Sequence, residues 1–271
     1  MTLKRFVQQV SFKRLMRSIA RDLLPYAGLE VQTPAGLHLC VPDRGAWSSL
    51  GEVFIARGYD PFYQQLDGVR HWVDLGCNQG FFSFGLLDHL AGRNAGKPPE
   101  TRVFLGDAGD ACVARASAAI ERNGLQSRWK CERVVIGPPG ETVVFRQHKD
   151  SLHSNIFGRG HYVRTFNCPT TDITELLARQ TDLFDLVKID IEGAEKFLFD
   201  NHLGFLKRFR YGLCEWHAPV FPGTELESRL RRLNWRTVRF CSSGVDYDLR
   251  RGNAWESLMG TVLWENPAPA H

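Results

Sequence analysis

The chain has 271 residues, of which 43% are hydrophobic and 24% are charged. This balance is typical of a globular protein and excludes a chain dominated by disorder. The net charge of +4 arises from 34 basic and 30 acidic residues, so it does not indicate a nucleic-acid partner. No apolar stretch of the sequence reaches the roughly 18 residues that a membrane span requires.

Seven cysteines are scattered along the chain, and none forms a Cys-x-x-Cys pair. A disulfide framework or a structural zinc site would have a different spacing. The basic N-terminus lacks the apolar segment and small-residue cleavage site of a secretory signal. We therefore expect small buried thiols in a reducing compartment, and a cytoplasmic protein.

Residues 1–68 are predicted to form an extension that packs on the core. Residues 4–24 combine apolar side chains at helical spacing with basic residues, which predicts a basic amphipathic helix. We favour its packing on the domain over the alternative, a weak contact with an anionic membrane surface. Residues 29–41 (LEVQTPAGLHLCV) predict a short hairpin, and a helix or loop is expected around 49–68.

Residues 69–271 alternate apolar strand candidates with helical segments, a pattern that predicts βαβ units in a single domain. The expected fold class is α/β, with one doubly wound, mostly parallel sheet covered by helices on both faces. Strands are expected at 71–76, 102–106, 131–137, 182–190, 211–216, 236–241 and 260–265.

A glycine-containing turn, VDLGCNQG at residues 73–80, follows the first of these strands directly. Such a turn lets the backbone approach a ligand at the carboxyl end of a strand. The spacing differs from the Gly-x-Gly-x-x-Gly of dinucleotide sites, since Asn78 and Phe81 replace the second and third glycines. This difference argues against a nicotinamide cofactor. The predicted cofactor-binding residues of the turn are Asp74, Gly76, Cys77, Asn78 and Gly80.

An acidic residue, Asp107, ends the next strand in RVFLGDAGD. A carboxylate at this position can accept hydrogen bonds from both hydroxyls of a ribose. Asp110 competes for the same role, although it also suits the N-terminus of a helix. We favour Asp107 as the ribose ligand.

Two later strand ends carry further polar residues, in LVKIDIEGAE and LCEWH. At a period of two, Lys188, Asp190 and Glu192 are expected on one strand face. Three charges there are costly in a sheet that is covered on both faces. Glu215 and His217 follow the next strand, beside Asp190. Glu195 is explained by the dipole of the helix that it begins.

Taken together, these segments resemble the FkbM family of methyltransferases. The matching segments, within about residues 50–220, are VDLGCNQGFFS, RNGL, TTDITELL, LVKIDIEGAE and LCEWH. The resemblance implies a Rossmann-like class I methyltransferase fold, S-adenosyl-L-methionine as cofactor, and methylation of hydroxyls on sugars, glycolipids or natural-product scaffolds. The chain departs from the family at Gly106–Ala108, where an aromatic-Glu-Pro sequence is usual, and at Cys77, where alanine is usual.

The predicted catalytic residues are His217, Glu192 and Asp190, because a neutral alcohol needs a base nearby. His217 is preferred for its ordinary pKa. We predict no resident metal, with one alternative: Asp190, Glu192, Glu215 and His217 could hold a divalent cation.

Residues 151–168 suit a mobile lid or an ordinary exposed loop. The expected partner is a hydroxyl-bearing small molecule or saccharide, and no nucleic acid. Two other functions remain open, a nicotinamide-dependent oxidoreductase and a catalytically silent membrane-surface binding module.

Overall fold

The computed structural model describes residues 29–66, 68–148, 162–178, 184–218, 220–242, 245–246, 254–256 and 259–267. The predicted basic helix at residues 4–24 therefore lies outside the described residues. Within the described ranges, no helix combines the length and the apolar character that a membrane crossing requires.

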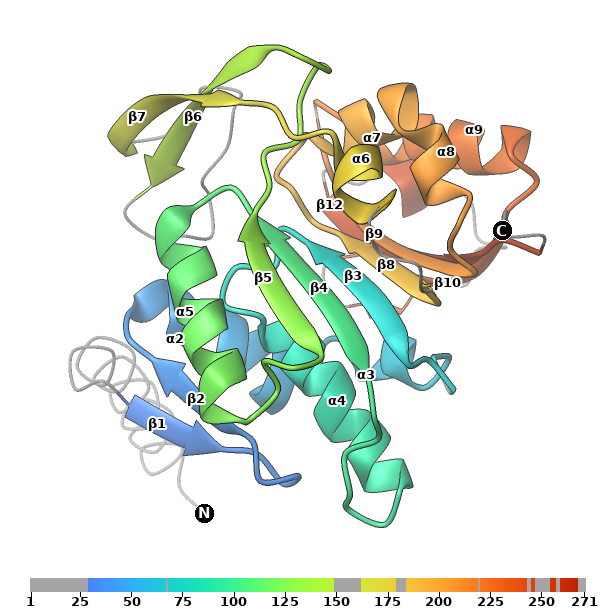
Figure 1. Cartoon of the computed structure of the whole chain (residues 1–271). Helices are drawn as coiled ribbons and strands as arrows, with labels where there is room; N and C mark the ends of the chain where they lie inside the picture. Colours follow the sequence, from blue (N-terminus) through green and yellow to red (C-terminus); the bar gives the residue numbers. More distant parts are fainter. Residues whose placement is uncertain are drawn as a thin grey trace, which may run out of the picture.

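An eight-stranded sheet forms the centre of the molecule, in the order β11-β10-β12-β9-β8-β3-β4-β5 (Figure 1). The strands β9, β8, β3, β4 and β5 pair in parallel, and β12 lies antiparallel between β9 and β10. The sheet is mostly parallel and lies between two layers of helices, so the predicted α/β fold class with one doubly wound sheet is confirmed. The bounds are β3 His71–Leu75, β4 Arg102–Asp107, β5 Trp129–Arg133, β8 Leu186–Ile189, β9 Tyr211–His217, β10 Arg236–Ser242, β11 Val245–Asp246 and β12 Met259–Glu265.

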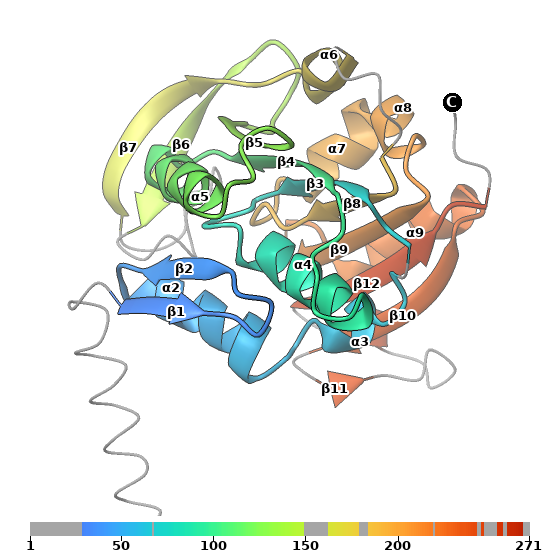
Figure 2. The same cartoon turned by 60° about the horizontal axis from the view of Figure 1, so that its bottom comes forward.

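Helices cover each face of the sheet (Figure 2). The side chains on each face form a hydrophobic cluster of their own. Because side chains alternate along a strand, Val103 and Leu105 of β4 join one layer and Phe104 joins the other. The first layer contains the N-terminal extension with α4 (Phe81–Arg93) and α5 (Asp110–Arg122). The second contains α6 (Ile173–Ala178), α7 (Glu195–Asn201), α8 (Leu203–Leu206) and α9 (Gly223–Arg232).

The N-terminal extension contains the predicted hairpin, which pairs β1 (Leu29–Gln32) with β2 (His38–Val41). It continues through α2 (Arg44–Leu50), a π-helix, η2 (Gly51–Ile55), and α3 (Asp60–Tyr63). Leu39, Leu50 and Phe62 are buried in the same cluster as Trp72 and Phe82 of the main domain. The extension and the domain therefore share one layer of the core.

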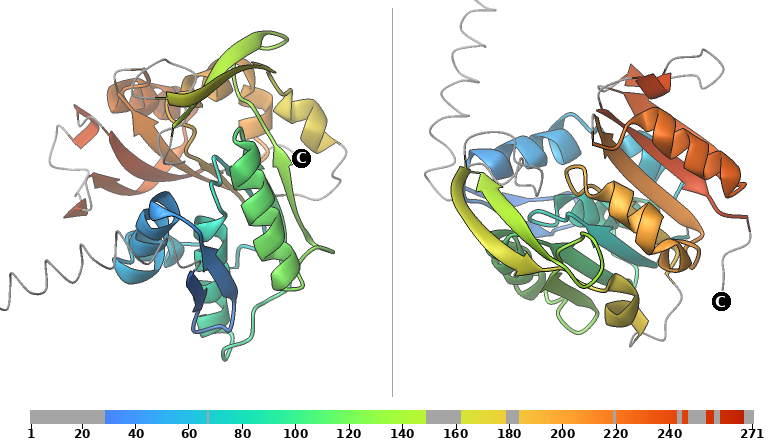
Figure 3. Two further views of the ribbon diagram at one scale, coloured as in Figure 1. Left: turned by 90° about the vertical axis from the view of Figure 1, so that its left-hand side faces the viewer. Right: turned by 90° about the horizontal axis from the view of Figure 1, so that it is seen from above.

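A second hairpin, β6 (Thr142–His148) and β7 (Tyr162–Pro169), lies outside the main sheet, near the carboxyl ends of β4 and β5 (Figure 3). It accounts for two differences from the predictions. The strand expected over 131–137 ends at Arg133, because the chain leaves the sheet to reach this hairpin. Residues 162–168, expected in a lid or loop, pair as β7 and bury Cys168 beside Phe145.

The six cysteines whose side chains are described are free thiols. Cys77, Cys112, Cys168 and Cys214 are buried, in agreement with the expectation of small apolar side chains. Cys40 is exposed and Cys131 is half-buried.

Candidate functional site

A cavity opens where β3, β4 and β8 end, the crevice in which open α/β sheets bind ligands. The loop after β3 and the end of β4 contribute Gly76, Cys77, Asn78 and Asp107 to its lining, and the loop after β8 contributes Asp190 and Glu192. Three strand ends that are distant in sequence thus converge on one site. Asp74, Gly80 and His217, which were also predicted, are not among the residues that line the cavity.

The turn after β3 depends on Gly76, whose φ is +72°. A Cβ atom at this position would lie 1.6 Å from the backbone oxygen of Asp190. The backbones of Gly76 and Asp190 therefore approach as closely as only a glycine permits. Asn78 adopts a φ of +50° without being glycine, and its backbone N–H donates a 2.8 Å hydrogen bond to Asp107 Oδ2.

Below the turn, Asp74 and Lys188 form a buried ion pair, with 3.3 Å between Lys188 Nζ and Asp74 Oδ1. Lys188 Nζ also donates a 2.9 Å hydrogen bond to the carbonyl of Gly76 and lies 3.3 Å from Asp190 Oδ2. Asp74 Oδ2 accepts a hydrogen bond from the Ser83 hydroxyl. Burial raises the pKa of Asp74, and the nearby ammonium of Lys188 opposes that shift. Asp74, a predicted cofactor-binding residue, is fully buried beneath the turn and does not line the cavity.

Replacing Lys188 by methionine should lower the free energy of unfolding by about 3–5 kcal/mol, because Asp74 would remain buried without its cation. Denaturant unfolding measures the loss, and the double variant Lys188→Met/Asp74→Asn should regain much of it. Lys196→Met is the control, since Lys196 is 39% exposed and its ion pairs should contribute about 1 kcal/mol or less. Equal losses for the two single variants would contradict the supporting role of Lys188.

Asp107 connects the loops that follow β3 and β4. Its Oδ1 accepts the Gly109 N–H and its Oδ2 accepts the Asn78 N–H, each at 2.8 Å. Each carboxylate oxygen has a further lone pair that can accept a ligand hydroxyl. Burial raises the pKa of Asp107 to about 6, against the effect of the two N–H donors. The competing residue Asp110 is 65% exposed, pairs with Arg133 and does not line the cavity.

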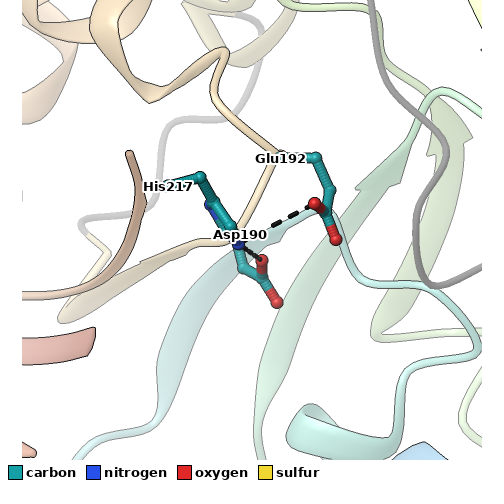
Figure 4. A group of neighbouring side chains, drawn as sticks. All are labelled: Asp190, Glu192 and His217. Carbon is teal, nitrogen blue, oxygen red and sulfur yellow. Dashed lines mark ion pairs between the residues drawn. The ribbon is translucent and has the colours of Figure 1, made fainter. Parts of the chain in front are cut away.

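The side chains of Asp190, Glu192 and His217 point toward one another (Figure 4). His217 Nε2 lies 3.8 Å from Asp190 Oδ1, 3.9 Å from Glu192 Oε2 and 3.9 Å from Glu215 Oε1. The strand β8 ends at Ile189, so Asp190 and Glu192 lie in the following loop. They do not occupy the strand face on which they were expected, and Glu192 has a φ of +56°.

Glu195 orients this histidine from beneath. Its side chain is fully buried, and Glu195 Oε1 accepts hydrogen bonds from His217 Nδ1 at 3.1 Å and from the N–H of Ile191 at 2.9 Å. The sequence interpretation, which assigned Glu195 to a helix dipole alone, missed its contact with His217.

The crowded carboxylates change the protonation of the group. Burial, followed by the Asp190 charge, raises the pKa of both Glu192 and Glu215 to about 8. Burial alone would lower the pKa of His217, but the hydrogen bond to Glu195 and the nearby carboxylates raise it to about 10. His217 was preferred as the base because an unperturbed histidine has a pKa near neutrality. Its surroundings in the structure raise that pKa.

Other walls of the cavity come from residues that the sequence did not single out. Phe145 of β6, with Val134, Val135 and Ile136, gives an apolar wall beside Asp107. On another side, η2 and its neighbours contribute Ser49, Glu52, Val53 and Tyr59. No local motif marks these positions, because their place in the site depends on the packing of segments that are distant in sequence.

No family model matches the chain, and no curated protein matches it. The similar solved structures include the N-terminal domain of human METTL16 in complex with S-adenosylhomocysteine, at 12% identity and a TM-score of 0.44, covering 92% of this chain and 93% of that chain. They also include the O-methyltransferase of Bacillus cereus in complex with the same compound, at 13% identity and a TM-score of 0.41, covering 81% and 91%.

A third similar structure is TrmK of M. capricolum, also in complex with S-adenosylhomocysteine, at 10% identity and a TM-score of 0.44, covering 80% of this chain and 70% of that chain. Another structure of the METTL16 methyltransferase domain is matched over 66% of its length. These superpositions are partial, and the fold class follows from the strand order of the chain itself.

Proposed function

We propose that the chain is an S-adenosyl-L-methionine-dependent methyltransferase that methylates a hydroxyl of a small-molecule or saccharide acceptor. The observation that carries the proposal is the convergence in one cavity of a glycine turn, an acid suited to a ribose, and two further acids, Asp190 and Glu192, that lie next to His217. The FkbM resemblance favours a sugar, glycolipid or natural-product scaffold as the acceptor.

The residues of the cavity fit the parts of this cofactor. The N–H groups of Gly76, Cys77 and Asn78 are already hydrogen-bonded, so the turn offers the amino-acid end the second lone pairs of its carbonyl oxygens. Asp107 has lone pairs for two ribose hydroxyls. The apolar wall of Val134–Ile136 and Phe145 suits a flat adenine ring. A dinucleotide would need a pyrophosphate site, and the turn lacks the glycines that such a site uses.

The bound cofactor would supply a reactive sulfonium methyl group. The chain must then hold the acceptor oxygen in line with that methyl and take up the hydroxyl proton. Asp190 and Glu192 line the cavity, and His217 lies directly behind them, so this cluster is the proposed destination of the proton. Glu195 acts as a positioning residue, since it fixes the ring of His217.

Calorimetric titration with S-adenosylhomocysteine tests the proposal, with NADH as the comparison ligand. Asp107→Asn should weaken S-adenosylhomocysteine binding by at least about tenfold, because charge-assisted hydrogen bonds contribute about 1.5–3 kcal/mol each. Asp110→Asn, the matched control, should leave the affinity unchanged. If Asp110→Asn weakens binding and Asp107→Asn does not, the ribose ligand is Asp110 and not Asp107. Binding of NADH in place of S-adenosylhomocysteine would overturn the proposed function.

The same titration should depend on pH. The ribose contact needs the carboxylate of Asp107, so affinity should fall as the pH is lowered through about 6, the pKa of that group, and Asp107→Asn should remove this dependence. Stability has the opposite sign, because a raised pKa means that the folded chain binds the proton more tightly. The protonated carboxyl stabilises the fold below its ordinary pKa of 3.8, and this contribution is lost as the pH rises through about 6.

A further inference from the structure

The acidic cluster has the spacing of a ligand shell around a point. His217 Nε2 faces oxygens of Asp190, Glu192 and Glu215 at 3.8–3.9 Å, longer than a hydrogen bond. In the described part of the chain, ligand atoms of Asp190, Glu192 and His217 all lie within 4.8 Å of one another. Ligands about 2.1 Å from a metal ion are about 3.0–3.4 Å apart when adjacent and about 4.2 Å apart when opposite. A small contraction of the side chains would therefore complete such a shell.

A second, buried element points to the same ligand. Metal-binding histidines usually donate their other N–H to a carboxylate, which fixes the tautomer and directs the free nitrogen at the ion. His217 Nδ1 makes this bond to Glu195 Oε1. The other oxygen of that carboxylate, Glu195 Oε2, is buried with no hydrogen-bond partner among the described residues. The fully buried Glu195 thus places an uncompensated acceptor beneath the cluster.

The excess of negative charge in the cluster also favours the binding of a cation. When ionised, Asp190, Glu192, Glu195 and Glu215 bring four negative charges together. Two positive charges oppose them, one from Lys188, whose Nζ lies 3.3 Å from Asp190 Oδ2, and one from protonated His217. Because Lys188 approaches Oδ2, the Oδ1 atom of Asp190 remains directed at His217. Partly buried charges that lack counter-charges are destabilising.

We infer that Asp190, Glu192, Glu215 and His217 bind a divalent cation of the Mg²⁺ and Mn²⁺ class. Three oxygen ligands and a single nitrogen favour these ions over those that prefer thiolate or several imidazoles. The ligand side chains are 17–30% exposed, and Asp190 and Glu192 line the cavity, so coordination positions remain open to water or an acceptor oxygen.

The cation gives the cluster a specific role that rests on the proposed function. A hydroxyl bound to a divalent cation loses its proton more readily. An acceptor with two neighbouring hydroxyls, as in a sugar, could bind the ion through both oxygens and present one to the methyl group. The cation thus favours vicinal diols among the proposed acceptors.

Titration of the full chain with Mn²⁺, followed by the electron paramagnetic resonance signal of the free ion, tests the inference. We expect one bound ion per chain. Glu192→Gln and His217→Gln should each weaken binding by at least about tenfold, and Glu195→Gln by about 10–100-fold. Glu100→Gln is the control, because Glu100 is 95% exposed and precedes β4, whereas the cluster lies at the carboxyl ends of the parallel strands. Circular dichroism checks that every variant folds.

An undiminished free-ion signal with about 1 mM Mn²⁺, a concentration that occupies even weak protein sites, would overturn the inference. Equal Mn²⁺ affinity for Glu192→Gln and Glu100→Gln would do the same. Calorimetry with S-adenosylhomocysteine on the same sample separates the two proposals. If the chain binds S-adenosylhomocysteine but not Mn²⁺, only the cation site is contradicted. If it binds Mn²⁺ but not S-adenosylhomocysteine, the cation site is supported and the proposed function is contradicted.

Discussion

A Gly76→Ala variant is expected to bind S-adenosylhomocysteine at least about 100-fold more weakly than the unmodified chain. The added methyl group would meet the backbone oxygen of Asp190 at 1.6 Å and its carbonyl carbon at 2.6 Å. Neither atom is the end of a flexible side chain, so the turn after β3 and the loop after β8 must move apart. Displacements of about 1 Å at a site can reduce its function by about 10². Isothermal titration calorimetry measures the change.

The control for this variant is Gly124→Ala. Gly124 has a similar φ of +65°, but an added Cβ would have no atom within 4 Å. Gly124→Ala therefore introduces the same backbone strain as Gly76→Ala, of the order of 1 kcal/mol, but no steric clash. Equal S-adenosylhomocysteine affinities for the two variants would show that the contact between Gly76 and Asp190 does not shape the binding site.

Glu192→Gln is expected to reduce methyl transfer by about 10²–10⁴-fold, the usual contribution of a group that handles a proton in the transition state. The substitution preserves the shape of the side chain and removes its ability to take up or release a proton. Because the proposed function assigns Glu192 to the acceptor, the affinity for S-adenosylhomocysteine should stay within about twofold. Release of S-adenosylhomocysteine in the presence of a panel of sugars and other hydroxylated compounds measures the turnover.

His217→Gln should produce a loss of the same kind, since His217 faces Glu192. Glu100→Gln again serves as the control and should retain full turnover. If Glu192→Gln and His217→Gln weaken S-adenosylhomocysteine binding as strongly as turnover, the cluster belongs to the cofactor site and not to the acceptor site.

The periodicity of the sequence predicted most of the sheet, because buried parallel strands are short apolar runs and the helices between them carry apolar stripes. It did not predict that β12 lies antiparallel between β9 and β10. That placement depends on pairing partners, which an apolar run such as GTVLWE does not encode by itself. For the same reason the hairpin β6–β7 was missed, since a long connection, residues 149–161, separates its two strands in the sequence.

The candidate site was predictable where its residues end a strand, as Asp107 does, or follow one directly, as Gly76 and Asp190 do. A strand end fixes the place of the next residues in the crevice. The sequence did not distinguish residues that line the cavity from residues that support it. Asp74 and Glu195 are both fully buried, and their roles follow from contacts with Lys188 and His217 across the sheet.

The backbone at the two rims of the cavity carries a cost of its own. Asn78 and Glu192 have φ angles of +50° and +56°. Glycine adopts this left-handed region without strain, whereas a residue with a side chain loses of the order of 1–3 kcal/mol of folding free energy there. Glycine at either position would relieve that cost and also remove a side chain from a residue that lines the cavity. Selection for thermostability should therefore favour glycine at these two positions. Each variant with a higher melting temperature should be tested for loss of S-adenosylhomocysteine binding.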